Sequence, residues 1–162
     1  MSGEGTQGRT AHLPAGEDQF RRRRKVFGSR VIDFKVSSLD TNGNLFIIEL
    51  TDDRKGGPPR HSHREQEEWF YVIEGEYIIE IGDERYELVS GDSVLAPRGV
   101  PHAWAHVGEG TGKQLIAFQP AGEMEAFFGE LSKIEGVPQP EVMQRLFSKH
   151  GMEMTGPPLS VE

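Results

Sequence analysis

The chain has 162 residues, including 20 glycines and 10 prolines, a composition that favours one domain of short strands joined by many turns. It contains no cysteine, which excludes disulfide bonds and thiolate metal ligands. A formal net charge of −8 argues against a nucleic-acid partner, and the lack of a long apolar run or an apolar signal core argues against a membrane partner and favours a cytoplasmic location.

Residues 1–25 differ from the rest of the chain in composition. They show no apolar periodicity, hold six basic and three acidic residues, and end in the run "RRRRK". Because such a segment buries little apolar surface, we expect a disordered basic leader. A basic targeting or partner-binding arm is the alternative.

Between residues 26 and 120, short β-prone runs alternate with turn signals, a pattern typical of an antiparallel barrel. In "EYIIEI", for example, Tyr77, Ile79 and Ile81 share one face, as a half-buried strand requires. The predicted strands cover residues 30–36, 45–51, 68–74, 76–81, 85–90, 91–97, 102–107 and 113–119.

Residues 121–162 change period. Their first apolar residues fall on one helical stripe: Met124, Phe127, Phe128 and Leu131. A second helix is expected after Pro140, followed by the irregular tail "GMEMTGPPLSVE". The predicted fold class is therefore mainly β, a jelly-roll barrel over 26–120 with two short C-terminal helices packed on it. Phe127 and Phe128 either cover an opening of the barrel or belong to its core.

The stretch "HSHREQEEWF" carries the residues best suited to metal chemistry. His61 and His63 are two positions apart, so an extended strand places both rings on one face, roughly 6.6 Å apart. If "REQE" is a turn, the next strand begins at Glu68, and its inward face carries Glu68 and Phe70. Glu68 then returns to the histidine face as a third ligand. A chance surface pair of histidines is the alternative.

A second histidine segment, "GDSVLAPRGVPHAWAH", follows the strands. His102 begins a strand there and offers a third imidazole to the barrel interior. His106 shares its parity with His102 and Trp104, so we expect it to face the same cavity. It is either hydrogen-bonded inside the barrel or a substrate-contacting acid or base, and a fifth metal ligand is the remaining alternative.

Together the two segments resemble the two sequence motifs of the cupin superfamily. The first motif spaces His-x-His, a glutamate and a glycine, and the second spaces a glycine, Pro-x-Gly and a histidine. The matching residues are His61, His63, Glu68 and Gly75 for the first motif, and Gly91, Pro97, Gly99 and His102 for the second. Two positions depart from the pattern: Lys55 stands where the first motif begins with glycine, and His106 stands where the second ends with asparagine.

The resemblance implies a cupin-type double-stranded β-helix and one divalent metal ion per chain. The implied ligands are His61, His63, Glu68 and His102. Three imidazoles and one carboxylate suit Fe, Mn, Ni, Cu or Zn, and this ligand set does not choose among them.

The segments "APRGVPHAW" and "FQPAGEMEAFF" are most similar to those of quercetin 2,3-dioxygenase-like cupins. This resemblance implies a metal-dependent dioxygenase that acts on a small aromatic enol or hydroxyketone, with Glu68 as catalytic base. The expected substrate pocket contains Phe70, Trp104, His106 and Phe118. A metal-dependent isomerase or epimerase of a small hydroxycarbonyl compound, and a small-molecule-binding cupin without activity, are the alternatives.

The chain is also expected to form a homodimer. A short barrel has exposed sheet edges, and the segment 26–45 could cover them by pairing across a two-fold axis.

Overall fold

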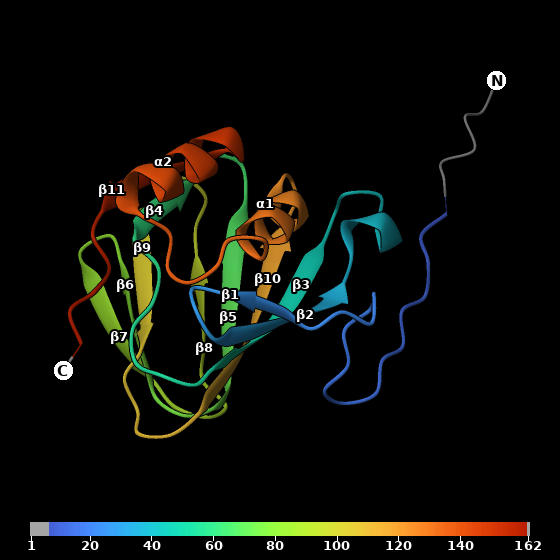
Figure 1. Ribbon diagram of the computed structural model, residues 1–162. Coiled ribbons are helices and arrows are strands. Elements are labelled where there is room, and N and C mark those ends of the chain that lie inside the picture. Colours follow the sequence, from blue (N-terminus) through green and yellow to red (C-terminus); the bar gives the residue numbers. More distant parts are fainter. Residues whose placement is uncertain (1–6, 162) are drawn as a thin grey trace.

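The computed structural model describes residues 7–161 as two antiparallel sheets that face each other and form a barrel (Figure 1). One sheet has the order β1-β2-β3-β10-β5-β8, and the other has the order β11-β4-β9-β6-β7. The strands are β1 (Arg24–Val26), β2 (Arg30–Val36), β3 (Phe46–Asp52), β4 (Arg60–His63), β5 (Glu67–Glu74), β6 (Tyr77–Ile81), β7 (Glu84–Leu88), β8 (Ser93–Ala96), β9 (His102–His106), β10 (Gly112–Gln119) and β11 (Met152–Gly156). The mainly β jelly-roll class expected from the sequence is confirmed.

Alternating burial shows why these segments are strands. Along β3, every second residue from Phe46 to Asp52 is buried, and β10 follows the same alternation. Since successive side chains of a strand point to opposite faces, this pattern turns one face of the sheet towards the barrel interior. The interior is filled by apolar side chains such as Phe46, Ile48 and Ile116.

Two helices, α1 (Met124–Leu131) and α2 (Pro140–Lys149), lie towards the same end of the barrel (Figure 1). The apolar stripe predicted for α1 is buried. Helix α2 begins with Pro140, which suits a first-turn position because its missing N–H group would have no partner there. Both predicted helices are therefore present, and they bring apolar side chains over the barrel.

The C-terminal segment differs from the predicted irregular tail. Met152–Gly156 forms β11, which pairs with β4, the strand that carries His61 and His63. Met152 is buried and Glu153 is exposed, so the segment alternates as a strand should. The signal is short and lies between glycine and proline residues, which explains why the sequence pattern favours a loop.

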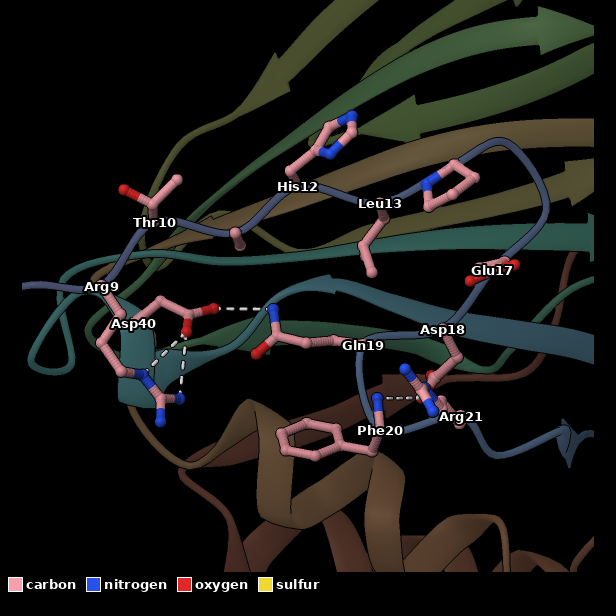
Figure 2. A pocket seen from close by; sticks show the side chains of 12 residues that line it. Arg9, Thr10, His12, Leu13, Glu17, Asp18, Gln19, Phe20, Arg21 and Asp40 are labelled. Atoms are coloured by element: carbon pink, nitrogen blue, oxygen red, sulfur yellow. Dashed lines mark hydrogen bonds and ion pairs between the residues drawn. The ribbon is translucent and has the colours of Figure 1, made fainter.

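Of the disordered leader expected for 1–25, the structure describes residues 7–25, whereas residues 1–6 lie outside the described residues. The segment is attached by polar contacts: the Arg9 backbone N–H donates to Asp40 O at 2.8 Å, and that of Gln19 donates to Phe34 O at 2.9 Å. Figure 2 shows the Arg9 and Gln19 side chains converging on the Asp40 carboxylate. Because these contacts are polar, the apolar periodicity of the sequence does not predict that the segment packs on the barrel.

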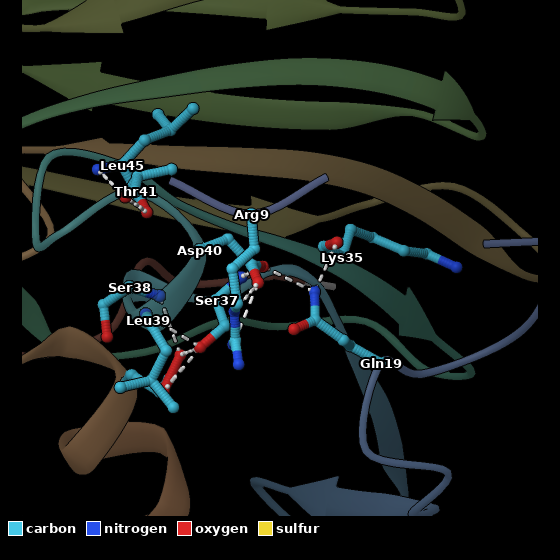
Figure 3. Close-up of polar contacts among 10 residues, drawn as sticks. Arg9, Gln19, Lys35, Ser37, Ser38, Leu39, Asp40, Thr41 and Leu45 are labelled. Atoms are coloured by element: carbon cyan, nitrogen blue, oxygen red, sulfur yellow. Dashed lines mark hydrogen bonds and ion pairs between the residues drawn. The ribbon is translucent and has the colours of Figure 1, made fainter. Parts of the chain in front are cut away.

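Asp40 belongs to η1 (Ser38–Asp40), a short 3-10 helix whose capping box is visible in Figure 3. The Ser37 backbone N–H donates to the Asp40 carboxylate at 2.9 Å. The Ser37 hydroxyl donates to Glu125 on α1 at 2.7 Å. One buried aspartate thus joins the N-terminal segment to the turn that α1 packs against.

Strand β1 lies at the edge of the first sheet and overlaps the segment 26–45 at Val26. The homodimer expected from such an edge stays a prediction, and light scattering would test it. Among the residues described, no helix is long and apolar enough to cross a membrane.

Candidate metal centre

Four side chains from three strands meet inside the barrel. His61 and His63 come from β4, Glu68 from β5 and His102 from β9. All four are buried, and their candidate ligand atoms lie within 4.8 Å of one another. The residues that the two sequence motifs group together therefore do converge, and this cluster could hold a metal ion.

The return of Glu68 to the histidine face follows from strand parity. Within β5, Glu68, Phe70 and Val72 are buried, whereas Trp69 is 38% exposed. The residues 64–66 form the connection between β4 and β5. The short turn reverses the chain, so the second acid of the "EE" pair enters the barrel.

Backbone carbonyls fix the orientation of two of the imidazoles. His61 Nδ1 lies 2.7 Å from Pro59 O, and His102 Nδ1 lies 3.2 Å from Val100 O. Because a carbonyl oxygen only accepts, each Nδ1 carries the proton and donates it. The Nε2 nitrogens are left for the centre of the cluster, which is the arrangement that metal-binding histidines use.

The Glu68 carboxylate lies between the rings of His63 and His102. Its Oε2 atom is 2.8 Å from His102 Nε2 and 2.8 Å from His63 Nε2. The His63 contact lacks hydrogen-bond geometry, so both ring nitrogens of His63 are buried without a hydrogen-bond partner in the described structure. An orphaned buried nitrogen beside a shared carboxylate oxygen fits a cation that both groups would bind.

The side chains of the cluster shift one another's pKa values. Burial and the neighbouring charges of His102 and His63 lower the pKa of His61 to about 3. Burial opposes a charge on His102, but the Glu68 carboxylate outweighs it and raises the His102 pKa above its ordinary value. Burial also raises the pKa of Glu68, yet the charges of His63 and His102 lower it more, to well below the usual range. Contact with the Glu68 carboxylate therefore favours the protonated form of the His102 ring.

A small cavity of about 30 Å³ adjoins His61, His63 and Glu68. Trp104 and Phe118 line it, as the strand parity predicts. Phe70 does not line it, so this part of the predicted pocket is wrong: the Phe70 ring packs against the His102 ring in a T-shaped arrangement, with ring centroids 6.0 Å apart.

His106 lies away from the cavity, so its place differs from the predicted substrate pocket. Its Nδ1 atom is 3.1 Å from Arg54 O, and its ring packs on Tyr77 at 5.2 Å. Gly112 approaches so closely that a Cβ there would meet His106 Cδ2 at 2.6 Å. The prediction that His106 faces the barrel interior is confirmed, because His106 is buried. Buried side chains such as Trp104 separate His106 from the metal cluster.

Sequence reasoning missed several apolar residues that line the cavity. They come from the β1–β2 turn, β3 and the C-terminal elements: Phe27, Leu50, Met124, Phe147 and Met152. Phe147 even contacts the His61 ring at a centroid distance of 4.9 Å. The helical stripe of α2 signals that Phe147 is buried, but only the packing of α2 on the barrel shows against what.

Known proteins are similar to this chain over the segment that carries the cluster. A family model described as "Cupin domain" matches residues 49–118, a range that holds all four clustered side chains. Quercetin 2,3-dioxygenase of Bacillus subtilis is 35% identical over 93 residues, and an uncharacterized protein of Methanocaldococcus jannaschii is 30% identical over 60 residues. The matches cover 57% and 37% of this chain but span only 26% and 48% of those two relatives.

Solved structures share the fold. An RmlC-like cupin from Shewanella frigidimarina superposes with a TM-score of 0.56 and 22% identity, covering 74% of this chain and 97% of that one. A protein described as a predicted oxalate decarboxylase from Thermotoga maritima superposes with a TM-score of 0.53 and 15% identity, covering 57% of this chain and 82% of that one. At such identities the likeness concerns the architecture alone.

Proposed function

Residues 49–118 form a cupin domain, and from this premise we propose that the chain is a metal-dependent dioxygenase of a small aromatic enol or hydroxyketone. The observation that carries the proposal is the buried cluster of His61, His63, Glu68 and His102, with its ligand atoms within 4.8 Å. The similarity to quercetin 2,3-dioxygenase supports the choice of reaction, although it covers a quarter of that protein.

The four clustered residues would hold one divalent ion. Three neutral imidazoles and one carboxylate are ligands that first-row transition metals accept. The chemistry that such an ion supplies is Lewis acidity and a template for the substrate oxygens.

Glu68 would accept the proton of the substrate hydroxyl. It is the one carboxylate in the cluster, and the rings of His63 and His102 contact the same oxygen. A positioned general base contributes about 10²–10⁴-fold to the rate, and the lowered pKa of Glu68 keeps its carboxylate ionised and able to accept a proton. Trp104 and Phe118 would flank the substrate, and the surrounding apolar side chains would exclude water.

A metal-dependent isomerase or epimerase is the second candidate. The cavity beside the cluster measures about 30 Å³, which suits the reacting end of a small hydroxycarbonyl compound better than a whole aromatic molecule. Such a reaction uses the same ligands and the same base but consumes no oxygen. A cupin that binds a small molecule without turning it over is the third candidate function.

Elemental analysis of protein purified without added metal, followed by oxygen-uptake assays, tests the proposal. We expect one equivalent of a first-row metal per chain and oxygen consumption with a flavonol such as quercetin. Turnover of hydroxycarbonyl compounds under nitrogen would favour the isomerase instead. A protein that carries no metal after loading with iron, manganese, nickel, copper and zinc in turn would overturn both enzymatic proposals.

A further inference from the structure

Two hollows of very different size meet at one side chain. The cavity beside the metal cluster measures about 30 Å³, and a groove of about 750 Å³ lies outside it. We call the second hollow the outer groove. It runs between the β1–β2 turn, the loop 54–59, the connection between α1 and α2, and the segment 154–158. Phe27 is the residue that lines both hollows.

Neighbouring residues also show that the two hollows are adjacent. Pro58 faces the cavity while Pro59 faces the outer groove. On α2, Phe147 lines the cavity and Met143, one helical turn earlier, lines the groove. The partition between them is therefore one side chain thick at Phe27.

The volumes decide where a substrate can sit. A pocket for a small organic ligand measures about 300–1,000 Å³, whereas about 30 Å³ is the volume of one water molecule in the liquid. The cavity thus has room for the reacting atoms only, and the outer groove has room for the rest of a ligand.

Phe27 has an uncommon backbone conformation. Its φ of 49° lies in the left-handed region, which is sparsely populated by bulky side chains. Its carbonyl oxygen accepts hydrogen bonds from Arg30 at 3.0 Å and from Arg54 at 2.9 Å. The two guanidinium groups hold the Phe27 backbone in place. The partition between the two hollows can therefore open only if the Phe27 side chain moves. Strained residues of this kind cluster at functional sites.

The lining of the outer groove indicates the ligand class. One end carries three cations, Arg30, Arg54 and Lys55, and no acidic residue is among the described residues that line the groove. Arg30 is neutralised by Asp52 at 2.9 Å, and Lys55 contacts the exposed Glu109, whereas Arg54 donates to a neutral carbonyl. The remaining lining is uncharged and, apart from the Gln139 amide, apolar, with five prolines, two methionines and Val137. In a chain of net charge −8, such a site favours an apolar anion.

We propose that the outer groove binds the body of an apolar, anionic substrate and that the Phe27 side chain is the movable partition through which its reacting end reaches the metal cluster. The part that concerns the metal rests on the proposed function, whereas the part that concerns the groove does not.

The groove is tested on metal-free protein with two fluorescent probes, anionic 1-anilinonaphthalene-8-sulfonate and neutral N-phenyl-1-naphthylamine. We expect the anionic probe to bind more tightly. Val137→Trp should fill the groove and weaken its binding by about tenfold or more, which corresponds to about 1.4 kcal/mol. Val89→Trp is the matched control, because Val137 is 62% and Val89 is 54% exposed but only Val137 lines the groove. Equal binding by the two variants would overturn the groove assignment.

The partition is tested by stopped-flow absorbance on cobalt-loaded protein, with 4-nitrocatechol as a large metal-directed probe and cyanide as a small one. Phe27→Ala, or Phe27→Leu if the alanine variant does not fold, should speed the association of nitrocatechol by about tenfold and leave that of cyanide unchanged. Val137→Trp should slow nitrocatechol alone. If the protein binds cobalt and these variants leave both rates unchanged, the partition is overturned while the metal site stands. If the protein binds no metal, the proposed function fails, and the probe experiment on metal-free protein still decides the groove.

Discussion

His102 Nε2 lies 2.8 Å from Glu68 Oε2, although the two residues are 34 positions apart in the chain. The contact also joins the two sheets across the barrel interior, because Glu68 belongs to β5 and His102 to β9. The contact places a carboxylate and an imidazole side by side where water is excluded. The first three predictions concern this pair and its neighbours.

His61→Ala should remove a buried imidazole nitrogen from the metal cluster. We expect the affinity for a divalent ion to fall by about 100-fold or more, because a direct ligand matters at least as much as the groups that orient it. Titration calorimetry with zinc measures the effect. His12→Ala is the control, since His12 is exposed and lies outside the cluster. Full metal binding by His61→Ala would contradict the ligand assignment.

Glu68→Gln keeps the size of the side chain and one carbonyl oxygen but removes its basicity. If Glu68 accepts the substrate proton, the variant should retain metal yet turn over about 10²–10⁴ times more slowly. Metal content and oxygen uptake are measured on the same sample. Unchanged turnover at full metal occupancy would leave Glu68 as a ligand only.

Metal affinity should fall as the pH falls. The Glu68 carboxylate raises the pKa of His102, so a proton occupies this ring over a wider pH range and competes with the metal. His61, whose pKa is about 3, stays neutral and does not compete at neutral pH. Calorimetry at about pH 6 and pH 8, in two buffers that differ in ionisation enthalpy, should show tighter binding at the higher pH and net release of protons at the lower one. A pH-independent affinity would contradict this account.

Tyr77→Phe tests a buried hydrogen bond between Tyr77 and Asp52, away from the metal cluster. The Tyr77 hydroxyl donates to Asp52 Oδ2 at 2.5 Å, and Asp52 is completely buried. Losing this donor leaves a buried carboxylate oxygen unpaired, which should lower the free energy of unfolding by about 1–3 kcal/mol. Urea denaturation provides the measurement. Tyr86→Phe is the control, because Tyr86 is 37% exposed, and it should change stability by less than about 0.5 kcal/mol.

Asp40→Asn should loosen the N-terminal segment. Burial raises the pKa of Asp40, but hydrogen bonds from Gln19, Ser37 and Arg9 outweigh it and hold the pKa below its ordinary value. A lowered pKa stabilises the fold above pH 3.8, the ordinary value of the group, and that contribution is lost as the pH falls through the folded pKa. We expect faster tryptic cleavage at Arg9 in the variant than in the wild type at neutral pH. In acid, where trypsin is inactive, loosening of the wild-type segment is followed by amide hydrogen exchange. The exposed Asp83→Asn should cleave like the wild type.

The candidate site is largely predictable because its residues follow local rules. Parity along "HSHREQEEWF" places His61, His63 and Glu68 on one side, and the same alternation places His102 in the barrel interior. Period-2 and period-3.6 patterns depend only on backbone geometry, so they can be read from neighbouring residues.

What the sequence hides depends on contacts between distant segments. Parity puts His106 inside the barrel, but it does not give the distance of His106 from the cluster. That distance depends on the packing around the His106 ring, where Tyr77 and Gly112 lie against it. Phe27 belongs to a short turn with no pattern of its own, yet it lines the cavity. Likewise, only the pairing of β11 with β4 shows that the tail is a strand.

That pairing has a consequence for the order of events during synthesis. Strand β4 pairs with β9 at a single position, His61 with His102, and has four paired positions with β11. The ribosome has therefore made every candidate metal ligand by residue 102, about fifty residues before the strand that steadies two of them. Until β11 is made, the histidines of β4 lack this pairing and can coordinate whichever metal ions are available. A metal ion bound at this stage would reflect which ions are abundant while the last third of the chain emerges, as well as the chemistry of the finished site.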